Sequence, residues 1–151
     1  MERAIKKVAI AGAGVMGSSI AQYFAERGLE VIVYDIVQAS LDKIDQTICE
    51  NQQLLIERGA LTVEQAAEAR ARVTTTSTLE DFAQVDLVIE AIIENMAIKQ
   101  DFFRQLENRI DLAVKISVIQ IIVLLTVNSY ILIGFNLENL FFIDHLPPFN
   151  Y

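Results

Sequence analysis

A chain of 151 residues is long enough for one domain with a substantial hydrophobic core. Its net charge of −8 makes nucleic acid and anionic membrane surfaces poor partners. The single cysteine, Cys49, excludes an internal disulfide and fits a reducing, cytoplasmic compartment, and its place in a helical pattern predicts an inert core thiol.

The first predicted element is a short buried strand over residues 7–11, which ends in Gly12-x-Gly14-x-x-Gly17. This order of strand and glycines is the dinucleotide-binding fingerprint. Gly12 allows a tight turn, Gly14 lets a pyrophosphate approach the backbone, and Gly17 lets the next helix pack close to the strand. The free N–H groups and the positive end of that helix would face the phosphates.

The helix after the glycines ends at Gly28, which we predict as its C-cap, and a second strand is predicted over 30–34. Asp35 follows at the end of this strand, 18 residues after Gly17. Its carboxylate would accept hydrogen bonds from a ribose 2′-hydroxyl and repel a 2′-phosphate, so NAD is favoured over NADP. The alternative for Asp35 is a solvated acid at a strand end.

A helical hairpin inserted after the second strand is predicted over residues 38–72. Its long helix stops at Gly59, and Thr62 and Gln65 have the spacing of a capping box that opens a short helix. The apolar stripe of the long helix consists of Leu41, Ile44, Ile48 and Leu55. Simple cover for the sheet is the alternative role of this hairpin.

Two more strands follow, predicted over 72–76 and 86–91, with a short turn of helix between them that Thr78 caps. A helix over 97–110 comes next, and its apolar stripe consists of Ile98, Phe102, Leu106 and Ile110. Alternating strands and helices predict an α/β fold, a Rossmann-type doubly wound parallel sheet.

A ligand of such a sheet binds at the carboxyl ends of the strands, so residues 91–95 should line the cofactor crevice. Glu94 and Lys99 lie five residues apart at the mouth of the following helix. Their spacing alone favours roles that need no ligand: Glu94 as an acid near the positive end of the helix, and Lys99 as a solvated lysine.

Three blocks of sequence, 12–22, 34–41 and 86–99, together resemble the NAD-binding domain of the 3-hydroxyacyl-CoA dehydrogenases, including the 3-hydroxybutyryl-CoA members. The resemblance covers residues 4–111 and implies an oxidoreductase of fatty-acid metabolism that interconverts (S)-3-hydroxyacyl-CoA and 3-oxoacyl-CoA, with NAD taking the hydride. The implied cofactor-binding residues are Gly12, Ala13, Gly14, Val15, Met16 and Gly17 at the pyrophosphate, Asp35 at the adenosine ribose, and Ile92, Ile93, Glu94 and Lys99 on the nicotinamide side. For Glu94 and Lys99 the resemblance therefore favours a role at the cofactor site, which is the opposite of what their spacing alone favours.

Two motifs of that family are missing after Asp111: Ser-Asn-Thr-Ser-Ser, and His-Phe-Phe-Asn-Pro with its catalytic histidine. The resemblance also implies a helical substrate domain, which carries most of the homodimer contact in the family and which we expect this chain to lack. His145 lies near the expected position of the catalytic histidine, but we interpret it as a tail histidine and assign no catalytic or metal-binding residue. We therefore expect NAD binding with little or no turnover from this chain alone, acyl-CoA being the substrate of the full-length family.

The tail over 112–151 differs in composition from the domain over 1–111, because its charged residues are Lys115, Glu138 and Asp144. One interpretation is a membrane span over the charge-free residues 116–137, which its polar residues disfavour. Another is a native tail whose residues 116–123 form a fifth strand.

The preferred interpretation of the tail is a reading-frame change near Asp111. A set of codons that encodes residues 119–124 also encodes Ser-Asn-Asn-Ser-Ser when the reading frame is shifted by two bases. This peptide is close to the missing Ser-Asn-Thr-Ser-Ser motif. Two other functions stay open: a non-catalytic NAD-binding module, membrane-tethered or regulatory, and a relative of the same fold that acts on a sugar acid.

Overall fold

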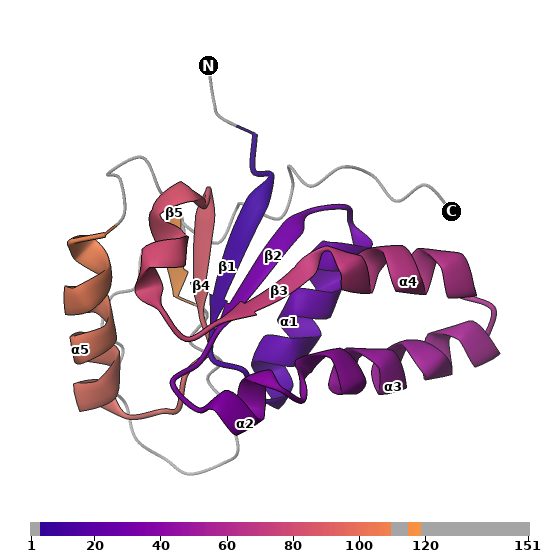
Figure 1. Cartoon of the computed structure of the whole chain (residues 1–151), viewed down its shortest axis with the longest axis horizontal. Coiled ribbons are helices and arrows are strands. Elements are labelled where there is room, and N and C mark those ends of the chain that lie inside the picture. The colour runs from indigo at the N-terminus through magenta and orange to yellow at the C-terminus, as the bar shows by residue number, and fades with distance from the viewer. Residues whose placement is uncertain (1–3, 110–114, 119–151) are drawn as a thin grey trace, which may run out of the picture. The chain divides into compact units, whose positions relative to one another are not determined.

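The structure, a computed structural model, describes residues 4–109 and 115–118. Within them the chain forms a parallel sheet with the strand order β3-β2-β1-β4-β5 (Figure 1). The strands are β1 (Lys7–Ala11), β2 (Glu30–Tyr34), β3 (Val73–Thr76), β4 (Leu87–Glu90) and β5 (Lys115–Val118). This order, with every neighbouring pair parallel, confirms the predicted doubly wound Rossmann-type fold.

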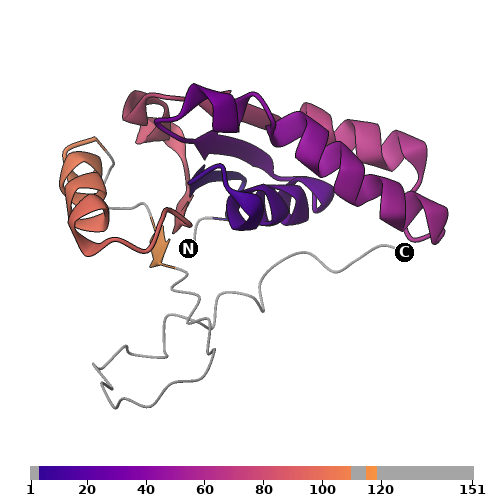
Figure 2. The ribbon, with the colours of Figure 1, turned by 90° about the horizontal axis from the view of Figure 1, so that it is seen from below.

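Helices connect the strands and cover both faces of the sheet, and Figure 2 shows α1 and the 3₁₀ helix η1 on opposite sides of it. They are α1 (Val15–Glu26), α2 (Gln38–Leu41), α3 (Ile44–Glu57), α4 (Val63–Ala71), η1 (Leu79–Gln84) and α5 (Met96–Glu107). Coverage on both faces explains why the central strands β1, β2 and β4 are largely apolar and buried, whereas the edge strand β3 contains three threonines.

Two hydrophobic clusters form the core, one on each face. Alternation along β1 sends Val8 and Ile10 into the cluster with α1 and α3, and Ala9 and Ala11 into the cluster with η1 and α5. The small alanines leave room for Phe82 of η1, which is fully buried.

Helix α1 ends as the sequence predicts. Gly28 has a φ of +83°, and its N–H donates to the Ala25 carbonyl at 3.0 Å. Because this left-handed conformation is easily adopted only by glycine, Gly28 turns the chain directly into β2.

The hairpin over 38–72 consists of α2, α3 and α4, and its capping box between Thr62 and Gln65 is confirmed. The single long helix predicted before Gly59 is wrong, because the chain breaks between α2 and α3. The predicted burial of Cys49 is also wrong: this residue is exposed, since the buried stripe of α3 runs through Ile44 and Ile48.

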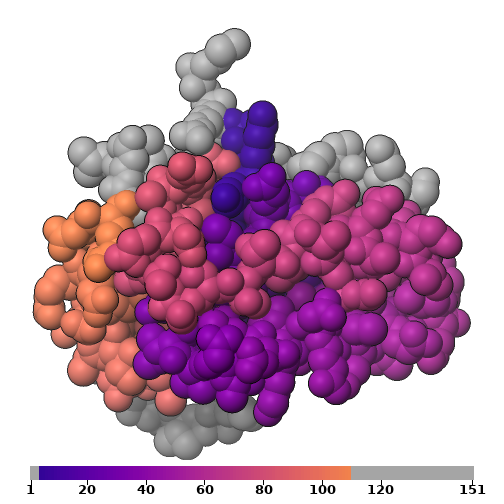
Figure 3. Space-filling view, viewed as in Figure 1, coloured from indigo at the N-terminus to yellow at the C-terminus, as the bar shows by residue number. Residues whose placement is uncertain are grey.

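A buried polar residue, Gln52, continues the stripe of α3 and ties the hairpin to α1. Its side chain donates to Glu26 at 3.2 Å and accepts from Arg70 of α4 at 3.0 Å. Figure 3 shows the hairpin helices packed along each other at the surface. The network explains how a hairpin with few buried apolar residues is fixed in orientation.

Two further local predictions need correction. The Thr78 side chain does not cap η1; its backbone N–H donates instead to the Thr76 hydroxyl at 3.1 Å. Ile98, predicted to be in the apolar stripe of α5, is exposed, and the neighbouring Lys99 is buried in its place. Ile110, the last member of that stripe, lies outside the described residues.

The tail is described only at 115–118, where β5 pairs with β4. The predicted fifth strand over 116–123 overlaps it at 116–118, and the other predictions for the tail, including His145, lie outside the described residues. No helix in the described part of the chain is long and apolar enough to cross a membrane.

Candidate functional site

The carboxyl edge of the sheet brings three predicted segments together. Ala11, the last residue of β1, pairs with Tyr34 on one side and with Glu90 on the other. The Gly12 amide donates to the Tyr34 carbonyl at 2.7 Å, and the Ala91 amide donates to the Ala11 carbonyl at 2.7 Å. The glycine turn therefore lies between the segments that follow β2 and β4, the usual ligand position of such a sheet.

Two of the three glycines are required by the protein itself. Gly12 has a φ of +110°, and a Cβ there would lie 2.4 Å from the Ala91 carbonyl oxygen. A Cβ on Gly17 would lie 1.8 Å from the Gly12 carbonyl oxygen, so Gly17 allows α1 to pack on the turn. Both roles agree with the sequence analysis.

The third glycine, Gly14, has no such requirement. Its φ of −74° and ψ of −173° are accessible to any residue, and a Cβ there would have no atom within 4 Å. Gly14 is the N-cap of α1, and it is exposed together with Val15 and Met16. The first N–H groups of a helix have no intrahelical partner, and the first turn of α1 contains no acid, so this end is suited to an anion.

Asp35 lies beside the glycine turn, as predicted. Its carboxylate accepts a hydrogen bond from the Ala13 amide at 2.8 Å and another from the Val37 amide at 2.9 Å. The alternative of a merely solvated acid therefore does not describe this residue, which connects the end of β2 to the turn after β1.

The segment after β4 forms the other side of the site. Ile92 is half-buried, whereas Ile93 and Glu94 are exposed. Asn95 is the N-cap of α5, because its side-chain oxygen accepts from the amides of Ala97 at 3.0 Å and Ile98 at 3.2 Å. An asparagine directly before an apolar-periodic segment is the sequence signal that could have identified this cap.

Lys99 is not a solvated lysine but is 8 % exposed between two carboxylates. Its ammonium donates to Glu94 at 2.8 Å and forms an ion pair with Glu90 at 3.2 Å, where the approach is not aligned as a hydrogen bond. Burial lowers the pKa of Lys99, but the contacts with Glu94 and Glu90 outweigh this effect and raise it above its usual value. Glu90, which the sequence analysis did not assign to the site, is thus part of it.

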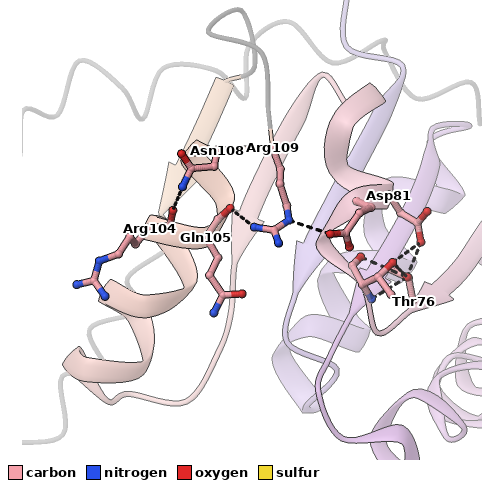
Figure 4. Close-up of polar contacts among 8 residues, drawn as sticks. Thr76, Asp81, Arg104, Gln105, Asn108 and Arg109 are labelled. Carbon is pink, nitrogen blue, oxygen red and sulfur yellow. Dashed lines mark hydrogen bonds and ion pairs between the residues drawn. The ribbon is translucent and has the colours of Figure 1, made fainter.

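A polar hollow of about 420 Å³ lies elsewhere, between β3 and η1, and includes Thr76, Glu80 and Asp81 in its lining. Beside it, the Thr76 hydroxyl donates to Asp81 (Figure 4). Arg109, which follows α5, donates to Glu80 of η1 at 3.0 Å. The Arg109 contact lowers the pKa of Glu80. These contacts fix η1 and α5, and no predicted site residue is among them.

Comparison with known sequences agrees with this geometry. Residues 7–121 match the family described as "3-hydroxyacyl-CoA dehydrogenase, NAD binding domain". A probable 3-hydroxybutyryl-CoA dehydrogenase of Deinococcus radiodurans is 43% identical over 100 residues, which are 66% of this chain and 36% of the relative. The 3-hydroxybutyryl-CoA dehydrogenase of Clostridioides difficile is 37% identical over 67% of this chain and 36% of its own length. The chain thus spans about a third of these relatives.

Solved structures give the same result. The (S)-3-hydroxybutyryl-CoA dehydrogenase PaaH1 of Ralstonia eutropha matches with a TM-score of 0.73 and 35% identity, over 76% of this chain and 41% of that one. FadB2 of Mycobacterium tuberculosis matches with a TM-score of 0.74 and 31% identity, over 77% of this chain and 41% of that one. The matched part is an NAD-binding domain, so NAD is the cofactor, and the chain belongs to the 3-hydroxyacyl-CoA dehydrogenase family.

Proposed function

We propose that this chain supplies the NAD site of a cytoplasmic oxidoreductase that interconverts (S)-3-hydroxyacyl-CoA and 3-oxoacyl-CoA. Gly12 to Gly17 would hold the pyrophosphate, Asp35 the adenosine ribose, and Ile92 to Glu94 would line the wall after β4, with Lys99 behind Glu94. Bound NAD would supply the hydride acceptor. The acyl-CoA substrate comes from the family resemblance and from the names of the relatives.

One observation carries the cofactor assignment: Gly14 lacks a side chain at a position where the protein has ample space for one. A glycine in an ordinary conformation at an exposed helix N-terminus is explained if something outside the protein approaches the backbone there. A pyrophosphate fits, because it needs both the space and the unpaired amides.

Exposed apolar side chains around this helix end support a ligand with flat aromatic rings. Val15, Ile36 and Ile93 follow the carboxyl ends of β1, β2 and β4, and each is more than 70 % exposed. Large apolar groups gathered at one edge are typical of binding surfaces. The adenine and nicotinamide rings would cover apolar surface of this kind.

Asp35 supports NAD over NADP. Its carboxylate lies beside the turn and would meet a 2′-phosphate with like charge, and residues 36–40 contain no arginine that could compensate. Titration calorimetry with NAD and with NADP tests the assignment: we expect heat of binding with NAD and weaker or undetectable binding with NADP. Equal affinity for the two nucleotides would contradict the role of Asp35.

We further propose that the chain by itself has little or no turnover. The described residues that surround the candidate site contain no histidine, and a general base near neutral pH is most often a histidine. Mixing the purified chain with NAD and 3-hydroxybutyryl-CoA and following NADH formation tests this proposal. Turnover at a rate usual for enzymes, about 10 per second, would contradict it.

A further inference from the structure

The wall after β4 contains a buried carboxylate whose presence needs an explanation. Glu90 is 1 % exposed at the last position of β4, where the preceding residues Leu87 to Ile89 are buried and apolar. Replacing a buried ion pair by apolar residues of similar volume is often neutral or stabilising. Stability alone therefore does not account for a charge at this position.

One carboxylate oxygen of Glu90 fixes the backbone next to the glycine turn. Oε1 accepts a hydrogen bond from the Ile92 amide at 2.8 Å. A Cβ on Gly12 would lie 2.7 Å from the Ala91 carbonyl carbon and 3.0 Å from the Ile92 nitrogen, so Gly12 rests directly on this peptide. Glu90 thus holds in place the peptide against which the glycine turn packs.

The other oxygen of Glu90 contacts Lys99, which in turn contacts Glu94 at the surface. Oε2 lies 3.2 Å from the Lys99 ammonium, which donates at 2.8 Å to Glu94. The side chains of Glu90 and Lys99 are buried, whereas that of Glu94 is 68 % exposed. The three charges form one continuous chain in which only Glu94 is open to a ligand.

We infer that Glu90 is a positioning residue of the NAD site: it holds the Ile92 amide against the glycine turn and, through Lys99, holds the Glu94 carboxylate at the mouth of the site. This inference rests on the proposed NAD binding. It gives Lys99 the task of orienting Glu94, because two carboxylates already contact its ammonium.

Affinity for NAD, measured by calorimetry on the full chain, tests the part of the inference that concerns Glu94. Glu90→Gln keeps an oxygen for the Ile92 amide but removes the charge that faces Lys99. We expect Glu90→Gln and Glu94→Gln each to lower the affinity about tenfold, within the range for residues of one network. If Glu90 acts on NAD through Glu94, the double variant should bind NAD no more weakly than Glu94→Gln alone. A double variant whose loss of affinity equals the product of the two single losses would overturn the claim that Glu90 acts through Glu94. Glu107→Gln, an exposed acid on α5, is the control.

A paired variant, Glu90→Leu with Lys99→Met, covers the case in which Glu90→Gln fails to fold, because it removes both buried charges together. We expect faster hydrogen exchange at the Ile92 amide, with the amides of Leu87 to Ile89 unchanged, and NAD affinity lowered about tenfold. Unchanged exchange at Ile92 would overturn the inference. A wild-type chain that binds no NAD would instead overturn the proposed function, while the exchange at Ile92 would still test the positioning.

Discussion

The Asp35 carboxylate and the Ala13 amide are joined by a hydrogen bond of 2.8 Å. The residue that we propose to bind the ribose therefore also braces the glycine turn, from its position directly after the neighbouring strand β2. Since a second bond of 2.9 Å joins it to the Val37 amide, both oxygens of Asp35 are engaged before any ligand arrives. In the proposed function, the side chain that braces the turn is therefore also the one that recognises the ribose.

Replacement of this side chain should affect folding and binding together. Asp35→Ala leaves two backbone amides without their charged acceptor, so we expect the free energy of unfolding to fall by about 2 kcal/mol. Asp35→Asn keeps one acceptor oxygen and should lose less stability, yet it should narrow the preference for NAD over NADP. Urea denaturation and calorimetry measure the two effects. An unchanged cofactor preference in a folded Asp35→Asn variant would contradict this account.

Gly12 and Gly17 should behave as structural glycines. Gly12→Ala forces a Cβ into the Ala91 carbonyl at a φ of +110°, and we expect a loss of about 3 kcal/mol of unfolding free energy. Gly17→Ala should be at least as damaging, because its Cβ would meet the Gly12 carbonyl. Chemical denaturation measures both losses. A stable Gly12→Ala variant would show that the contact with Ala91 is not tight.

Gln52 should be important for the orientation of the hairpin. Gln52→Met preserves the volume but leaves Glu26 and Arg70 without their common partner, so we expect a loss of about 1–3 kcal/mol. Limited proteolysis should then cut more readily between α3 and α4. Gln53→Met, on the exposed side of the same helix, is the matched control and should cost little.

The pH dependence of stability should have a decline at alkaline pH. The pKa of Lys99 is raised in the folded chain, because the contacts with Glu94 and Glu90 outweigh its burial. A group whose folded pKa is raised stabilises the fold below its unfolded value, about 10.4, and this stability is lost as the pH rises through the folded pKa. The pKa of Tyr34 is raised by burial and by Asp35, and it acts in the same direction.

Urea denaturation from about pH 9, below the unfolded pKa values of both groups, to about pH 12, above the unfolded value of lysine, follows this decline. The paired variant Glu90→Leu with Lys99→Met should show a flatter curve than the wild type, and Tyr34→Phe should remove the second contribution. A variant with the same slope as the wild type would show that the charges around Lys99 are not coupled to folding.

Local signals predicted much of the fold. The bounds of β2, the cap at Gly28, the capping box at Thr62 and the roles of Gly12 and Gly17 depend on residues close in sequence, and the structure confirms them. The errors arose where tertiary contacts decide. Periodicity placed Ile98 toward the core, but a buried acid on β4 draws the next residue, a lysine, inward instead.

The site was predictable as far as its parts carry separate motifs. The glycines and Asp35 belong to a recognisable motif. Glu90, in contrast, is the last residue of an apolar strand, and its partner Lys99 is nine residues away on a helix. The hydrogen bond between Asp35 and Ala13 likewise joins the segments that follow two different strands, β2 and β1. Contacts of this kind follow from strand order and register, which no local pattern contains.

The most direct measurement is NAD binding to the wild-type chain and to Gly14→Thr, with the stability of each measured in parallel. Threonine is about as good an N-cap as glycine, so the free energy of unfolding should change by less than about 0.5 kcal/mol. Its side chain would fill the space proposed for the pyrophosphate, and NAD affinity should fall at least about tenfold, or 1.4 kcal/mol. Ala67→Thr, at an exposed position of α4, should leave affinity unchanged. A folded Gly14→Thr variant that binds NAD as tightly as the wild type would contradict the account.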